Sequence, residues 1–172
     1  MKTLFRYLYT FIIQVVIFIA LGEIICSWYL PTPEQKMSIH YGSAEFDKKL
    51  GWKTKANYQF QDSMKTLEGE PYSINYKTSK FGFREYGNIK TDKKKILFVG
   101  DSFTQSAEVS NDKVFYNHLK DSLEVEIFAF GVGMFGTYQE YLVVDQFIDS
   151  IQPDLVVWQF CDNDFIDNYR PL

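Results

Sequence analysis

The chain has 172 residues, of which 46% are hydrophobic and 18% aromatic, so it can form a sizeable buried core. Its net charge of −4 gives no reason to expect nucleic acid as a partner. Two cysteines are too few for a disulfide framework, and no cluster of His, Cys, Asp and Glu has metal-ligand spacing. Phosphate-loop and dinucleotide-binding glycine motifs are also missing, so we expect neither a metal nor a cofactor.

The first element is an almost continuously apolar stretch from Tyr7 to Leu30, long enough to cross a hydrocarbon core as one helix. Lys2 and Arg6 precede it, which favours a cytoplasmic N-terminus and an extracytoplasmic C-terminal part. We therefore expect residues 1–30 to be a single-pass membrane anchor. The alternative is a signal peptide that is cleaved, which would leave a secreted protein.

Residues 31–94 mix polar and aromatic side chains, which predicts a linker followed by a small β-rich accessory region. Short runs at 58–60 and 73–76 predict strands, with a turn at 68–71. Arg84 follows a glycine turn close to the next region. A surface or salt-bridged arginine is the favoured interpretation of Arg84, and a place in the substrate cleft is the alternative.

From residue 95 onward, β-prone apolar runs alternate with helical patterns, which predicts an α/β fold. We expect a three-layer α/β/α sandwich with a parallel sheet and right-handed crossovers. The expected elements are strands near Ile96–Val99, Val125–Phe130 and Leu155–Phe160, and helices at Asn111–Leu123 and Tyr138–Ile151. Helical spacing predicts apolar faces made by Phe115, Leu119 and Leu123 in the first helix, and by Tyr141, Val144, Ile148 and Ile151 in the second.

Each of the three expected strands is followed by a segment whose side chains or backbone could take part in binding or catalysis. These segments are Gly100-Asp101-Ser102, a glycine-rich loop that contains Gly133 and Met134, and Asn163-Asp164. Because the carboxyl ends of parallel strands lie at one edge of a sheet, we expect a hydroxyl, backbone N–H groups and an amide to meet there. For Gly-Asp-Ser alone, a turn with an N-capping serine is the alternative.

This ordered set of motifs resembles the SGNH (GDSL-type) hydrolase family, from about Ile96 to Asn168. The resemblance implies a flavodoxin-like fold in which the Gly-Asp-Ser strand lies between the other two. It implies that Ser102 is the nucleophile of a serine esterase. It also implies an oxyanion hole made by the Ser102 N–H, a backbone N–H of Gly133 or Met134, and the Asn163 amide.

The chain departs from the family pattern in three places. The usual Asn of the second block is Ala129. The family's glycine falls on Met134, where a positive φ would be costly. The family's general base is a His with an Asp three residues earlier, and neither His40 nor His118 has one. We therefore interpret residues 95–172 as an incomplete catalytic domain, cut before its base. Asp101 is expected to shape the Gly-Asp-Ser turn, and Asp164 to cap the following helix or to tie the third loop to the second.

The expected reaction is acyl transfer from an ester to water, with an acyl ester as substrate. Extracytoplasmic placement points to esters of the cell envelope or of exported carbohydrate. One alternative is an O-acyltransferase that uses a sugar hydroxyl as acceptor. The other is a non-catalytic, membrane-anchored remnant or binding module.

Overall fold

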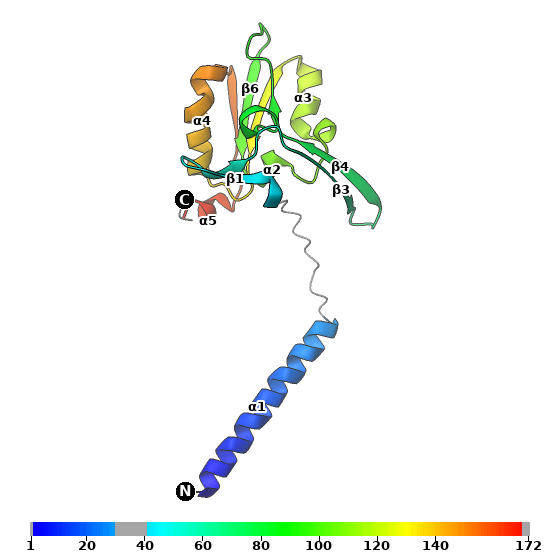
Figure 1. Cartoon of the computed structure of the whole chain (residues 1–172), viewed down its shortest axis with the longest axis vertical. Coiled ribbons are helices and arrows are strands. Elements are labelled where there is room, and N and C mark those ends of the chain that lie inside the picture. Colours follow the sequence, from blue (N-terminus) through cyan, green and yellow to red (C-terminus); the bar gives the residue numbers. More distant parts are fainter. Residues whose placement is uncertain (1, 30–40, 170–172) are drawn as a thin grey trace. The chain divides into compact units, whose positions relative to one another are not determined.

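The computed structural model describes residues 2–29 and 41–169, which belong to two separate units. The first unit holds the helix α1, Lys2–Tyr29 (Figure 1). Its segment Phe5–Ile25 has a mean hydropathy of 2.3, and none of that segment is buried. The helix is long and apolar enough to cross a membrane, although a signal sequence would have the same properties. Leu30, the predicted last residue of this helix, lies outside the described residues.

The second unit is built on a four-stranded sheet with the order β5-β7-β6-β8. The strands β6 (Lys95–Gly100), β7 (Glu126–Gly131) and β8 (Leu155–Gln159) are parallel to one another, and the Gly-Asp-Ser strand β6 lies in the middle as expected. The fourth strand, β5 (Glu85–Tyr86), pairs antiparallel with β7. The sheet is therefore mixed, and the expectation of a purely parallel sheet is wrong for this edge.

Helices connect the parallel strands. Strand β6 is connected to β7 by α2 (Ser102–Gln105), the 3-10 turn η3 (Asn111–Lys113) and α3 (Phe115–Leu123), and β7 to β8 by α4 (Thr137–Ile151). The short helix α5 (Asp164–Asp167) follows β8. The predicted helix 111–123 is thus split. Val114 interrupts it with an extended backbone, at φ −69° and ψ 143°, and buries its β-branched side chain in the core.

The two central strands are buried on both faces, and alternate residues contact opposite hydrophobic clusters. One cluster joins Leu97, Val99, Phe128 and Phe130 to Val143, Phe147 and Ile151 of α4. The other joins Ile96, Phe98, Ile127 and Ala129 to Val114 and to Tyr116 of α3. Accordingly, α4 and α3 flank the sheet on opposite sides (Figure 1). The strand β8 forms an edge, and the side chains of Leu155 and Trp158 remain exposed.

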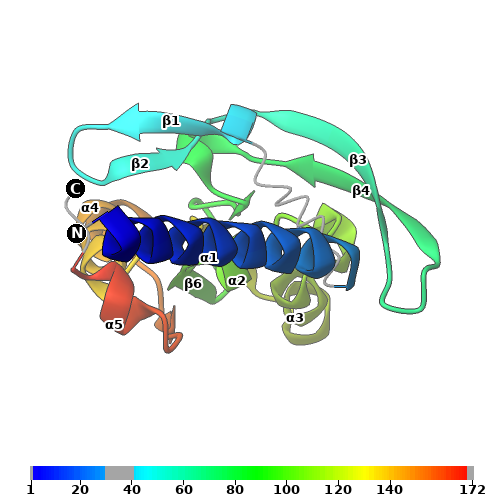
Figure 2. The same ribbon diagram turned by 90° about the horizontal axis from the view of Figure 1, so that it is seen from below.

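The accessory region forms two antiparallel hairpins, introduced by the 3-10 turn η1 (Tyr41–Ser43) and followed by η2 (Lys80–Gly82). Their strands are β1 (Ala44–Asp47) with β2 (Gly51–Thr54), and β3 (Gln59–Lys65) with β4 (Pro71–Lys77). The second pair contains the two short strands predicted from sequence. It extends away from the sheet in both views (Figures 1 and 2).

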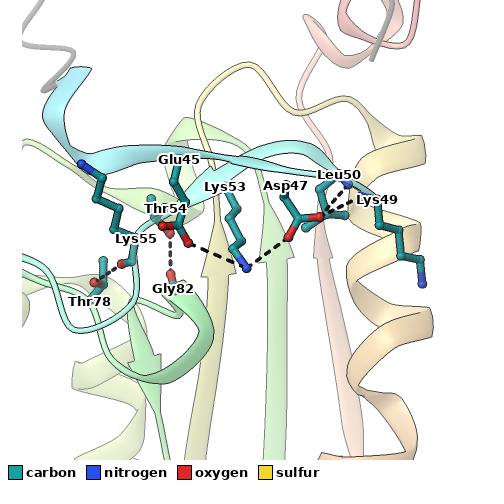
Figure 3. Close-up of polar contacts among 9 residues, drawn as sticks. All are labelled: Glu45, Asp47, Lys49, Leu50, Lys53, Thr54, Lys55, Thr78 and Gly82. Atoms are coloured by element: carbon teal, nitrogen blue, oxygen red, sulfur yellow. Dashed lines mark hydrogen bonds and ion pairs between the residues drawn. The ribbon is translucent and has the colours of Figure 1, made fainter.

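The β1–β2 hairpin is held together by polar contacts and fixed to the core by Leu50. Asp47 Oδ1 accepts hydrogen bonds from the N–H groups of Lys49 and Leu50, at 2.9 and 3.0 Å. Lys53 Nζ lies 3.1 Å from Asp47 Oδ2, and Thr54 donates to the carbonyl of Gly82 (Figure 3). The Leu50 side chain is buried in the cluster that contains α4. The Lys53 ion pairs lie within the hairpin, whereas the buried Leu50 side chain fixes the hairpin to the core.

Candidate functional site

Ser102 begins α2 immediately after β6. The preceding residue, Asp101, is fully buried and caps α2, since its Oδ1 accepts a hydrogen bond from the Phe103 N–H at 2.9 Å. Asp101 therefore shapes the Gly-Asp-Ser turn. The Ser102 side chain is exposed, and within residues 2–29 and 41–169 its hydroxyl makes no hydrogen bond. The turn thus presents a free hydroxyl at the carboxyl end of the central strand.

Two glycines let α2 pack directly against the strand ends. A Cβ atom on Gly131 would lie 2.3 Å from the backbone nitrogen of Gln105, and one on Gly100 would lie 2.3 Å from Thr104 Oγ1. Both distances are too short for a side chain, so only glycine permits this approach. The packing brings Ser102 to the second loop: a Cβ atom on Gly133 would lie 3.9 Å from Ser102 Cβ.

The second loop contains a four-residue β-turn, closed by a hydrogen bond of 3.1 Å from the Phe135 N–H to the Val132 carbonyl. Gly133 and Met134 are its central residues. Met134 has a φ of +67°, and a positive φ at the third residue is characteristic of a type II turn. Met134 therefore adopts the positive φ that the sequence analysis identified as costly for it, in a turn position where glycine is usual.

Both backbone polar groups of Gly133 are already paired. Its N–H donates to Gln105 Oε1 at 3.0 Å, and its carbonyl accepts a hydrogen bond from Trp52 Nε1 at 3.2 Å. In contrast, the Met134 N–H makes no hydrogen bond within the described part of the chain. Of the two backbone donors proposed for this turn, Met134 is the one free to bind an oxyanion.

Asn163, which follows β8, lies against the Gly-Asp-Ser turn. Its amide nitrogen Nδ2 donates to Asp101 Oδ2 at 3.2 Å and to Asp167 Oδ2 at 2.9 Å. The first of these bonds joins residues 62 positions apart and brings the first and third loops together. Because both amide hydrogens are engaged, Asn163 is not the free donor that we expected. To bind an oxyanion, the Asn163 amide would have to give up its hydrogen bond to one of these two carboxylates.

Asp164 links the third loop to the segment that follows the second. Its Oδ2 accepts hydrogen bonds from Thr137 Oγ1, at the start of α4, and from the Cys161 N–H, both at 3.3 Å. The helix α5 begins at Asp164 itself, with Asn163 in the capping position. Of the two roles expected for Asp164, the geometry is that of a tie between loops. Burial raises the pKa of its carboxyl group.

Glu140 is a buried acid that sequence reasoning missed. It is fully buried on α4, and its Oε2 accepts a hydrogen bond of 2.5 Å from Trp158 Nε1. Burial raises the pKa of Glu140 to about 7; the Trp158 bond opposes this, and the nearby carboxylates of Asp164 and Asp101 add to it. The sequence signal for its burial is spacing: Glu140 lies three and seven positions before Val143 and Phe147, which places all three on one face of a helix.

Arg84 holds the segment that follows α2. It is 2% exposed, and its guanidinium donates to the backbone carbonyls of Gln105, Ser106, Val109 and Lys77 and to Asn111 Oδ1. Its Cζ lies 3.9 Å from the centre of the Tyr76 ring. The favoured interpretation of Arg84 was wrong, because it is neither at the surface nor, among the described residues, in an ion pair. The guanidinium is bound to backbone rather than directed at a cleft.

No histidine base contacts Ser102 in the described residues. The His118 side chain is exposed on α3 and takes part in no hydrogen bond or ion pair there, and His40 lies outside the described residues. The same residues contain no group of three or more His, Cys, Asp and Glu side chains arranged to hold a metal ion. Within the described residues, the site therefore contains the Ser102 hydroxyl and the Met134 N–H, which make no hydrogen bond, and the Asn163 amide, which is bonded to two carboxylates.

No protein-family model matches this chain, and no curated protein matches it. The interpretation of the site therefore depends on its own motifs and geometry.

Proposed function

We propose that the chain is a serine acyl-ester hydrolase of the SGNH (GDSL-type) class, with Ser102 as its nucleophile. The observation that carries the proposal is the meeting of the three loops: Ser102 lies beside the Gly133–Met134 turn, and Asn163 is bonded to Asp101. The proposed fold is a three-layer α/β/α sandwich extended by β5. The parallel β6, β7 and β8 and the helices on both faces of the sheet support it.

In the proposed reaction, the Ser102 hydroxyl attacks the ester carbonyl and gives its proton to a base. The N–H groups of Ser102 and Met134 and the Asn163 amide stabilise the oxyanion of the tetrahedral intermediate. The base gives that proton to the leaving alcohol as the ester C–O bond breaks. Water then loses a proton to the same base, attacks the acyl carbonyl and releases the acid, and the serine takes the proton back. Glu140, bonded to Trp158 of β8, and Asp164, bonded to Thr137 and Cys161, are assigned no step in the reaction.

The proposed location is the membrane, with the N-terminus in the cytoplasm and the second unit outside. The apolar α1 and the basic residues Lys2 and Arg6 at its start support this orientation. The proposed substrate class, acyl esters of the cell envelope or of exported carbohydrate, depends on this location.

The test measures hydrolysis of p-nitrophenyl acetate by the full chain in detergent, with imidazole supplied as the base. We expect hydrolysis above the imidazole background, and we expect Ser102→Ala to abolish that excess. Asn163→Ala should lower the excess rate by about 10²–10³-fold, the cost of losing one oxyanion donor. Ser106→Ala is the matched control, since Ser106 ends the same short helix and its hydroxyl is bonded to the Phe103 carbonyl. Equal rates for the unaltered chain and Ser102→Ala would overturn the proposal.

A non-catalytic binding module is the second candidate, and specific observations favour it. Both amide hydrogens of Asn163 are bound to carboxylates, and no histidine contacts Ser102 within the described residues. For such a module, Ser102→Ala would leave every rate unchanged. The same assay therefore separates the two candidates.

A further inference from the structure

The accessory hairpin reaches into the candidate site through Trp52. Its indole Nε1 donates to the Gly133 carbonyl at 3.2 Å, across 81 positions of sequence. Trp52 lies on β2, in a region that the proposed chemistry does not otherwise use. Its partner atom belongs to the turn next to the nucleophile.

The bond to the Gly133 carbonyl fixes the direction of the Met134 N–H. These two groups belong to the same peptide unit, which is planar and trans, so the C=O and N–H point in opposite directions. Turning that peptide over would convert the type II turn to type I and would release Met134 from its left-handed conformation. It would also reverse the N–H. A donor on the Gly133 carbonyl opposes this rotation.

The indole is itself held in place. It packs edge-to-face on Phe135, with ring centroids 5.8 Å apart and an interplanar angle of 71°. The hairpin is also bonded to the helix that follows the turn, because Gln139 Nε2 donates to the Leu50 carbonyl at 2.8 Å. On the other side of the turn, Gln105 accepts from the Gly133 N–H. The turn is thus held from two directions.

We propose that Trp52 is a positioning residue of the oxyanion hole. Its indole N–H keeps the Gly133–Met134 peptide in the orientation that aims the Met134 N–H at the substrate carbonyl oxygen. This inference rests on the proposed function. It assigns to the accessory hairpin a part in the reaction that the Gly-Asp-Ser resemblance does not describe.

The test compares the full chain with Trp52→Phe, which keeps an aromatic ring against Phe135 and removes the N–H. Lys53→Met is the matched control, because it removes the ion pairs of the same hairpin and leaves the indole in place. We expect Trp52→Phe to lower kcat for p-nitrophenyl acetate, with imidazole, by about tenfold at an unchanged KM, since the misplaced donor acts in the transition state. Lys53→Met should leave both constants unchanged.

A second measurement follows the peptide itself. The ¹³C resonance of the Gly133 carbonyl and the ¹⁵N–¹H resonance of Met134 should shift in Trp52→Phe and stay in place in Lys53→Met. An unchanged kcat in Trp52→Phe, with hydrolysis still dependent on Ser102, would overturn the inference and leave the proposed function standing. Unmoved resonances would overturn it as well. If instead the unaltered chain showed no Ser102-dependent hydrolysis, the proposed function would fail, and the oxyanion role of Trp52 with it.

Discussion

At the scale of single residues, Met134 carries a side chain at a backbone position that glycine ordinarily occupies. Its φ of +67° costs a non-glycine residue roughly 1–2 kcal/mol, and the residue is 46% exposed, so little burial offsets the strain. We expect Met134→Gly to stabilise the chain by about 0.5–1 kcal/mol, after the extra flexibility of glycine in the unfolded state is counted. Urea unfolding in detergent measures the change, and a loss of stability would contradict the strain argument.

Glu140 makes stability depend on pH in a predictable direction. Its pKa is raised from 4.5 to about 7 by burial, so the folded protein binds its proton more tightly than the unfolded chain does. The stabilising effect of that proton is complete below pH 4.5 and is lost as the pH rises through 7. We expect Glu140→Gln, which stays neutral and keeps an acceptor for Trp158, to be more stable than the unaltered chain at pH 8 by about 2–3 kcal/mol.

Unfolding by urea between pH 4 and pH 9 measures this difference. The gap between Glu140→Gln and the unaltered chain should open between pH 4.5 and pH 7 and stay constant above that range. Asp149→Asn, which changes an exposed carboxylate on the same helix, is the matched control for removing a charge from α4. A gap of equal size at every pH would mean that the proton on Glu140 is not its cause.

At the scale of elements, Arg84 ties β5 and β4 to the segment that follows α2. Removing the guanidinium in Arg84→Met would leave several partly buried carbonyls without this donor, including those of Gln105 and Val109. We expect a loss of about 3–5 kcal/mol of stability and faster amide exchange across residues 105–111. Lys120→Met, which removes a partly buried ion pair with Glu85, should cost about 1 kcal/mol. Equal losses in the two variants would contradict this role for Arg84.

The strands were easier to predict than the buried faces of the helices. Continuous apolar runs of β-branched and aromatic residues end at glycine or polar residues, and such runs have few alternatives to a buried strand. In α3, however, the predicted apolar face of Phe115, Leu119 and Leu123 is exposed, while Tyr116 is buried. In α4, Val143 and Phe147 are buried beside Ile151, and Tyr141 is exposed. Each helix carries apolar residues on more than one face, and packing selects one of them.

At the scale of the whole molecule, the membrane assignment gives a direct prediction. A chain whose α1 remains attached should stay with the membrane pellet after carbonate extraction, because Phe5–Ile25 is long enough to cross a membrane and has a mean hydropathy of 2.3. Fractionation and blotting measure this. Recovery in the soluble fraction with a new N-terminus near Glu23 would instead identify the segment as a cleaved signal peptide.

The candidate site was predicted where its residues follow strands and was missed where distant segments meet. Parallel strands bring their carboxyl ends together, which is why Ser102 and Asn163 could be expected near each other. The partners of Gly133 could not be expected, because Gln105 and Trp52 lie 28 and 81 positions away. A half-buried indole N–H requires an acceptor, but the sequence does not say which one. The engagement of Asn163 by Asp167 likewise depends on the geometry of α5.

The open edge of β8 has a consequence for how the protein behaves when it is concentrated. Leu155–Gln159 carries no charge, and among the described strands none pairs with its outer side. Proteins usually protect such edges with lysine, proline or a covering segment, since exposed N–H and C=O groups attract further strands. We expect the apparent molecular mass of the detergent-solubilised chain, measured by light scattering, to grow with concentration. Leu155→Lys, which places a charge on this exposed edge, should suppress that self-association without disturbing the sheet.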